Sequence, residues 1–92
     1  MALLLSAFML AGCSNTYSRD DFNAGVIGKS EQEVTAKFGK PESIKAEGED
    51  SVTWTYSHVT FDLANQNRMD SKAIVTFQGP AGSRHATKVD FS

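Results

Sequence analysis

The sequence predicts one α+β domain, in which two short N-terminal helices pack on one face of a three- to four-stranded antiparallel sheet. Two observations support this fold class. Helix signals are confined to residues 18–38, whereas the alternation of apolar and polar residues that is typical of strands occupies residues 51–91. The length of 92 residues is that of one domain. Helices followed by strands, without a helix between each pair of strands, favour an antiparallel sheet.

The clearest helix signal predicts a helix over residues 31–38. Ser30 precedes Glu33 by the spacing of a capping box, in which each residue's side chain binds the other's backbone amide. Gly39 is placed to end the helix in a left-handed conformation, and Pro41 prevents the helix from continuing. The preceding helix is expected to be a short turn.

Strands are predicted from period-two alternation. The clearest is 51–57, where apolar residues alternate with Ser and Thr, and 73–78 and 87–92 repeat the pattern. A first strand extends through Ile44. Beyond residue 57 the apolar positions change parity, which predicts a bulge or bend near His58.

The predicted core combines one helix stripe with the inward face of the strands. A helical turn over 18–24, capped by Ser18, is expected to contribute to it. The expected core residues are Phe22, Val34, Phe38, Ile44, Val52, Trp54, Tyr56, Val75, Phe77, Val89 and Phe91.

The N-terminal segment has a different character from the rest of the chain. From Ala2 to Gly12 it carries no charge, and its apolar run is about half of the ~20 residues that a membrane-spanning helix needs. That length is typical of the apolar region of a signal peptide. No Lys or Arg precedes the run. We therefore expect the natural start to lie upstream of Met1, in a segment that encodes Lys or Arg.

Leu10-Ala11-Gly12-Cys13 resembles the lipobox of bacterial lipoproteins. In such signals the cysteine thiol receives a diacylglyceryl group, the chain is cleaved between Gly12 and Cys13, and the new amino terminus is acylated. We therefore expect residues 1–12 to be a removed signal peptide, 13–21 a lipidated tether, and 22–92 the folded domain. The alternative is a buried N-terminal helix with Cys13 in the core. Because Cys13 is the only cysteine, an internal disulfide and a zinc site built on cysteines are excluded.

Nucleic acid and nucleotides are not expected partners. The chain has 9 Lys and Arg against 11 Asp and Glu, so no basic surplus is available to neutralise phosphates. Residues 25–30, "GVIGKS", end like a phosphate-binding loop, but Asn23 stands where that motif requires its first glycine. We interpret Ser30 as a helix cap.

Catalytic and metal-binding patterns are weak. His58 and His85 lack the spacing of metal ligands. Ser57, His58 and Asp62 resemble a triad in composition, but adjacent strand residues point to opposite faces. The carboxylates of 47–50 lack calcium-loop spacing and indicate a solvated turn. We therefore expect no enzymatic activity and no cofactor besides the covalent lipid on Cys13.

Three segments together resemble the SmpA/OmlA family of outer-membrane lipoproteins, which includes the small accessory lipoprotein of the β-barrel assembly machinery. The segments are "GKSEQEVTAKFGKPESI", "SVTWTYS" and "AIVTFQGPAGSRHATKVDF", and the resemblance covers about residues 25–91. The residues that match the family pattern are Gly28, Ser30, Glu33, Val34, Gly39, Pro41, Trp54, Tyr56 and Phe77.

The resemblance implies an α-α-β-β-β fold, a lipid anchor in the inner leaflet of the outer membrane, and a domain that faces the periplasm. Ser14 stands where a retention signal for the inner membrane would have Asp, which agrees with the outer membrane. The stretch between Tyr17 and Gly28 is shorter than in the assembly-machinery subunit, and this favours a paralogue of that subunit.

The function expected from these features is a non-enzymatic accessory or scaffold role in cell-envelope integrity or β-barrel assembly. The alternative is an envelope lipoprotein that binds and inhibits a periplasmic enzyme, or a stress-related lipoprotein. Residues 62–72 are polar and predict a loop, and within it we expect Arg68, Met69 and Asp70 to contact an envelope protein partner. Met69 between opposite charges suits such a contact, although an ordinary solvated loop is the alternative.

Overall fold

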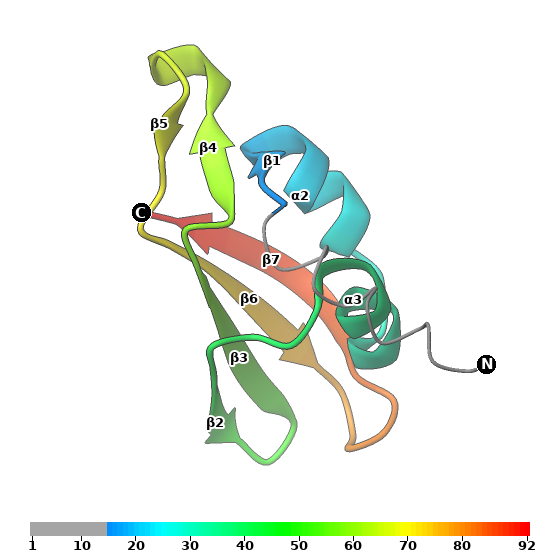
Figure 1. Cartoon of the computed structure of the whole chain (residues 1–92). Helices are drawn as coiled ribbons and strands as arrows, with labels where there is room; N and C mark the ends of the chain where they lie inside the picture. Colours follow the sequence, from blue (N-terminus) through cyan, green and yellow to red (C-terminus); the bar gives the residue numbers. More distant parts are fainter. Residues whose placement is uncertain (1–14) are drawn as a thin grey trace, which may run out of the picture.

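The computed structural model describes residues 15–92 and has the α+β fold predicted from the sequence (Figure 1). It contains two helices, a four-stranded antiparallel sheet and a smaller mixed sheet. The expected signal peptide, the expected lipid-attachment residue Cys13 and Ser14 lie outside the described residues.

Both helices begin at a serine cap. Helix α2 spans Arg19–Val26, and the Ser18 hydroxyl accepts a hydrogen bond from the Asp21 amide at 3.1 Å. Helix α3 spans Glu31–Phe38, as predicted, and begins with the complete capping box of Ser30 and Glu33. Gly39 ends α3 with φ +87°, but its ψ of −175° is extended, outside the left-handed helical region that was predicted.

The main sheet has the strand order β2-β3-β6-β7, and every neighbouring pair is antiparallel. Its alternation agrees with the sequence, because Val52, Trp54 and Tyr56 are buried while the residues between them are partly exposed. Trp54 lies opposite Val75 in the β3–β6 register. The bounds are Ser43–Gly48 for β2, Ser51–Ser57 for β3, Lys72–Gln78 for β6 and His85–Phe91 for β7.

The second sheet departs from the sequence prediction. It has the order β1-β4-β5, with β1 and β4 parallel and β4 and β5 antiparallel. We call residues 60–70 the β4–β5 arm; it includes a short 3-10 helix and projects beyond the main sheet (Figure 1). The predicted loop over residues 62–72 is therefore wrong in part, because Arg68 and Met69 pair with β4 and Lys72 begins β6. The bounds are Tyr17–Ser18 for β1, Thr60–Asp62 for β4, Leu63–Asn65 for the 3-10 helix and Arg68–Met69 for β5.

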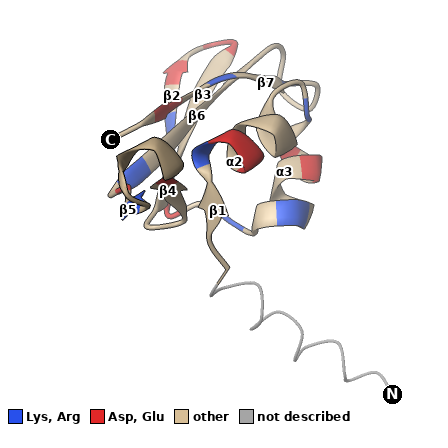
Figure 2. Ribbon diagram, turned by 90° about the horizontal axis from the view of Figure 1, so that it is seen from above, with Lys and Arg blue, Asp and Glu red and all other residues tan. Residues whose placement is uncertain are grey.

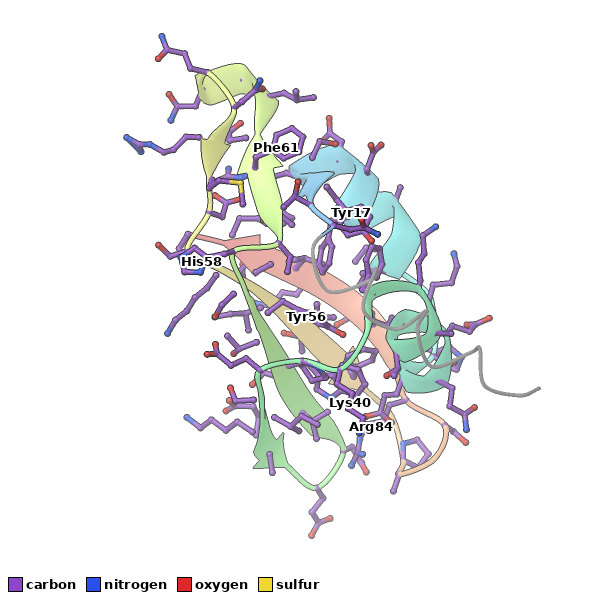
Figure 3. All side chains as sticks on the ribbon, in the orientation of Figure 1. Tyr17, Lys40, Tyr56, His58, Phe61 and Arg84 are labelled. Atoms are coloured by element: carbon purple, nitrogen blue, oxygen red, sulfur yellow. The ribbon has the colours of Figure 1, made fainter. Side chains whose placement is uncertain are left out.

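Ordered structure begins nearer the N-terminus than the expected domain boundary at Phe22. The Tyr17 amide donates to the Val59 carbonyl at 2.9 Å, and the Tyr17 ring meets the Phe38 ring edge-on, with centroids 4.8 Å apart. The predicted bend occurs at His58, which has φ +55° and lies at the corner between β3 and the β4–β5 arm (Figure 3). Tyr17 and Ser18 thus belong to the fold and not to a free tether.

The core lies between the helices and one face of the main sheet. Most of the predicted residues are buried, and Phe38, Val89 and Phe91 are partly buried against them. Ile44 is a wrong prediction, since 59% of it is exposed. Ile44 lies opposite Trp54 and so faces the helix side, but β2 lies beyond the cover of α2 and α3 (Figures 1 and 2). The buried core residues are Phe22, Val26, Val34, Val52, Trp54, Tyr56, Ala73, Val75, Phe77 and Ala86.

Candidate functional site

Asp70, one of the three residues expected to contact a partner, is the buried centre of a partly exposed polar cluster. Only 4% of Asp70 is exposed. Its carboxylate accepts from Arg19 Nη2 at 2.6 Å and Nε at 3.0 Å, and from the Thr60 hydroxyl at 2.8 Å. A bidentate guanidinium–carboxylate pair is a strong, directional contact. The expectation that Asp70 lies on a contact surface is therefore wrong, because its charge is already paired inside the protein.

The Arg19 guanidinium connects three elements. It lies 5.2 Å from the centroid of the Phe91 ring on β7, and its Nη1 lies 3.4 Å from Oδ2 of Asp62 on β4. The hydrogen bonds from Arg19 lower the pKa of the Asp70 carboxyl below its ordinary value, against the opposing effect of burial. This cluster fixes the β4–β5 arm against α2.

The β4–β5 arm carries two exposed apolar side chains, one in the 3-10 helix and one on β5. Leu63 is 60% exposed and Met69 is 42% exposed. Met69 lies opposite Phe61 in the β4–β5 register, and Phe61 is on the side of β4 that faces α2 (Figure 3). Arg68 is exposed beside Met69, as expected for a contact residue. Leu63, Arg68 and Met69 are therefore the side chains that the arm offers to a partner.

A hollow of about 310 Å³ adjoins this arm, at the place where the N-terminal turn of α2 meets the 3-10 helix. Arg19 and Asp62 contribute to it from opposite sides, and Leu63 lies at its rim. The residues that line it are Ser18, Arg19, Asp20, Asp62, Leu63 and Ala64. The arm therefore offers an exposed leucine beside a small charged depression.

A second hollow, of about 440 Å³, lies between α3 and β3. It is open and mainly apolar, and Trp54 forms part of it. The indole N–H of Trp54 has no hydrogen-bond acceptor among the described residues. The residues that line this hollow are Glu31, Gln32, Thr35, Ala36 and Trp54.

The side chains of Ser57 and Asp62 make hydrogen bonds within the fold. The Ser57 hydroxyl donates to Glu42, and Asp62 accepts from the Ala64 amide at 3.1 Å, which caps the 3-10 helix. Ser30 acts as the cap of α3, as predicted. Between residues 15 and 92, no group of three or more His, Cys, Asp or Glu side chains could hold a metal ion. In the same range no helix is long and apolar enough to cross a membrane.

Sequence reasoning missed Arg19 and Thr60, which pair with Asp70, and Leu63, which is one of the exposed apolar side chains of the arm. Arg19 is the only basic residue between Cys13 and Lys29. Nothing in the local sequence connects it with a carboxylate on a distant hairpin, so the pair becomes visible only in the fold.

Comparison of the chain with protein-family models, with curated proteins and with solved structures finds no match in any of the three.

Proposed function

We propose that this chain is a lipoprotein of the outer membrane, anchored by a lipid on Cys13 and facing the periplasm, with a non-enzymatic accessory role in envelope integrity or β-barrel assembly. The lipobox-like sequence ending at Cys13 supports the anchor. The core cluster, whose members run from Tyr17 to Phe91, supports a compact domain directly after that cysteine.

The short distance from Cys13 to Tyr17 supports a domain held against the membrane. Four peptide units join the two residues, and an extended chain of that length reaches no more than about 14 Å. Because Tyr17 is fixed by β1–β4 pairing, a lipid on Cys13 keeps the Tyr17 end of the domain within that distance of the bilayer. This placement favours partners that are themselves at or in the membrane.

The order of elements supports a relationship to the SmpA/OmlA family. Two helices precede the Trp54-containing strand and the β6–β7 hairpin, an order that is compatible with an α-α-β-β-β arrangement. We propose that the chain is a paralogue of the assembly-machinery subunit, with β2 and the small sheet added to that arrangement.

The observation that carries the proposed role is the pair of exposed apolar side chains on the β4–β5 arm. Leu63 and Met69 are exposed apolar side chains on a hairpin that the Arg19–Asp70 pair holds in place. A rigid arm loses little conformational freedom when it binds, so these apolar side chains can contribute usefully to affinity. The proposed contact surface consists of Leu63, Arg68 and Met69, and it no longer includes Asp70. The proposed partner is an envelope protein.

Intact mass of the mature chain tests the anchor. We expect loss of residues 1–12 and added acyl mass on a chain that begins at Cys13, and we expect Cys13→Ala to abolish both the added mass and outer-membrane fractionation. An unmodified mature mass with unchanged fractionation of Cys13→Ala would overturn the anchor.

Site-specific photocrosslinking in intact cells tests the arm. A photoreactive amino acid at Leu63 should capture an envelope protein, and the same amino acid at exposed Lys88 on β7 is the matched control. Capture of barrel-assembly proteins at Leu63 alone supports the proposed role. Capture of a periplasmic hydrolase at Leu63 would replace it with the inhibitor function, and equal labelling at both positions would remove the arm as the contact surface.

A further inference from the structure

The two edges of the main sheet differ in how they are covered. At the β7 edge the Gly28 amide donates to the Ala86 carbonyl, and the Ala86 amide donates to the Lys29 carbonyl, both at 2.9 Å. At the other edge, β2 pairs with β3 on one side, and no strand within residues 15–92 pairs with its free side. An edge strand presents unpaired N–H and C=O groups, which makes β2 a template for another strand.

The side chains of β2 have a defined pattern on each face. Ile44 faces the helix side with 59% exposure, and Ala46 follows on the same face, opposite Val52. Lys45 and Glu47 lie on the other face beside Thr53, whose hydroxyl donates to Glu47 Oε2 at 3.3 Å. Lys45 Nζ and Glu47 Oε2 are 3.9 Å apart. One face of the edge is apolar, and the other carries one charge of each sign.

We propose that β2 is the pairing edge for a second copy of this chain. The two β2 strands run antiparallel across a two-fold axis at Ala46, and the two four-stranded sheets, one from each copy, become one continuous sheet. In this register Lys45 of each copy lies opposite Glu47 of the other, so two attractive cross-strand pairs form. Ile44 lies opposite Gly48, which has no side chain to obstruct it.

Charge complementarity favours this register over the registers with the axis at Lys45 or at Glu47. Moving the axis to Lys45 would place two ammonium groups opposite each other, and moving it to Glu47 would do the same with two carboxylates. Both arrangements are unfavourable for directly opposed strand residues. The order Lys45-Ala46-Glu47 is complementary to itself under this axis, so a second copy supplies the partner of each charge.

The β-bulge between Ala46 and Gly48 limits the regular pairing to a short segment. Bulges and edge lysines discourage indiscriminate strand addition. We therefore expect a reversible dimer and not a filament. This inference does not depend on the lipid anchor or on the β4–β5 arm.

Charge reversal tests the dimer. The full chain carrying Cys13→Ser, which excludes both a lipid and an intermolecular disulfide, is studied by sedimentation velocity in density-matched detergent. Lys45→Glu places carboxylates opposite each other twice, and Glu47→Lys does the same with ammonium groups. We expect each single reversal to weaken dimerisation by about tenfold, and the double variant Lys45→Glu/Glu47→Lys to restore it to within about threefold.

Lys88→Glu on β7 is the matched control, because Lys88 Nζ also lies near a carboxylate two residues away, at 3.5 Å from Asp90 Oδ2. We expect it to leave dimerisation unchanged, and circular dichroism checks that every variant is folded. A parent chain that stays monomeric up to about 1 mM would overturn the proposal. So would single reversals without effect, a double variant that is not restored, or equal weakening by Lys88→Glu.

Discussion

Arg19 and Asp70, 51 residues apart in the sequence, are joined by two hydrogen bonds of 2.6 and 3.0 Å. This pair connects the first turn of α2 to the end of the β4–β5 arm. The Asp70 carboxylate is buried, whereas 36% of the Arg19 side chain is exposed. We call this ion pair, which is partly exposed to solvent and holds the β4–β5 arm against α2, the clamp.

Asp70→Asn tests the clamp. The amide keeps the size of the side chain and an acceptor for Thr60, but it removes the charge that pairs with Arg19. We expect the free energy of unfolding to fall by about 2 kcal/mol, the scale of a hydrogen bond to a charged group. Urea unfolding measures it, and Asp50→Asn in the exposed β2–β3 turn is the control, with no resolvable loss expected. Equal stability of Asp70→Asn and the parent chain would contradict the clamp.

The same carboxylate makes stability depend on pH. Arg19 holds the pKa of Asp70 below its ordinary value of 3.8. The folded state therefore binds the proton less tightly than the unfolded state, so this stabilisation is fully present above the ordinary pKa and is lost as pH falls through the lowered one. We expect urea midpoints of the parent chain to fall more steeply below about pH 4 than those of Asp70→Asn. Parallel curves for the two proteins would contradict the assignment.

Gly25→Ala should destabilise the protein even though alanine favours helices. A Cβ at Gly25 would lie 2.9 Å from Cζ of Phe38, because α2 and α3 approach closely at this point. The gain in helix propensity is about 1 kcal/mol, whereas crowding a packed ring costs about 1–3 kcal/mol. We expect a lower melting temperature, and no decrease for Asn23→Ala on the exposed side of the same helix. A rise in melting temperature for Gly25→Ala would show that the ring moves aside easily.

Ser30→Ala should destabilise α3. The Ser30 hydroxyl accepts from the Glu33 amide at 3.1 Å, and its loss leaves that amide without a partner in the protein. We expect a cost of about 1 kcal/mol in chemical denaturation, and recovery of most of it with Ser30→Asp, which restores an acceptor. Ser83→Ala in the β6–β7 turn is the control. A similar loss for Ser83→Ala and Ser30→Ala would argue against the cap as the cause.

Val75 should be much more sensitive to substitution than Ile44, although both are aliphatic residues on the helix-facing side of the sheet. Val75 is fully buried, and Ile44 is 59% exposed. We expect Val75→Ala to cost about 2 kcal/mol or more and Ile44→Thr less than about 0.5 kcal/mol, measured by urea unfolding at low protein concentration. Comparable losses at the two positions would show that β2 is packed more closely than its exposure indicates.

Local patterns in the sequence determined much of this protein. The capping box and Pro41 predicted the bounds of α3, because helix ends depend on contacts within a few residues. Alternation predicted the buried face of β3 and the bend at His58, because side chains on a strand follow a period of two. The lipid on Cys13 stays a prediction, since that residue lies outside the described part of the chain.

Only the tertiary structure determined that Ile44 is exposed and that Asp70 is buried. Alternation states that Ile44 and Trp54 share a face, but the helices cover that face only as far as β3, so the same pattern gives one buried and one exposed residue. The polarity of residues 62–72 suggested a solvated loop, but a guanidinium from the start of α2 pairs with Asp70 and makes burial of its charge tolerable. Sequence periodicity reports which side chains lie together, whereas burial depends on what distant segments place over them.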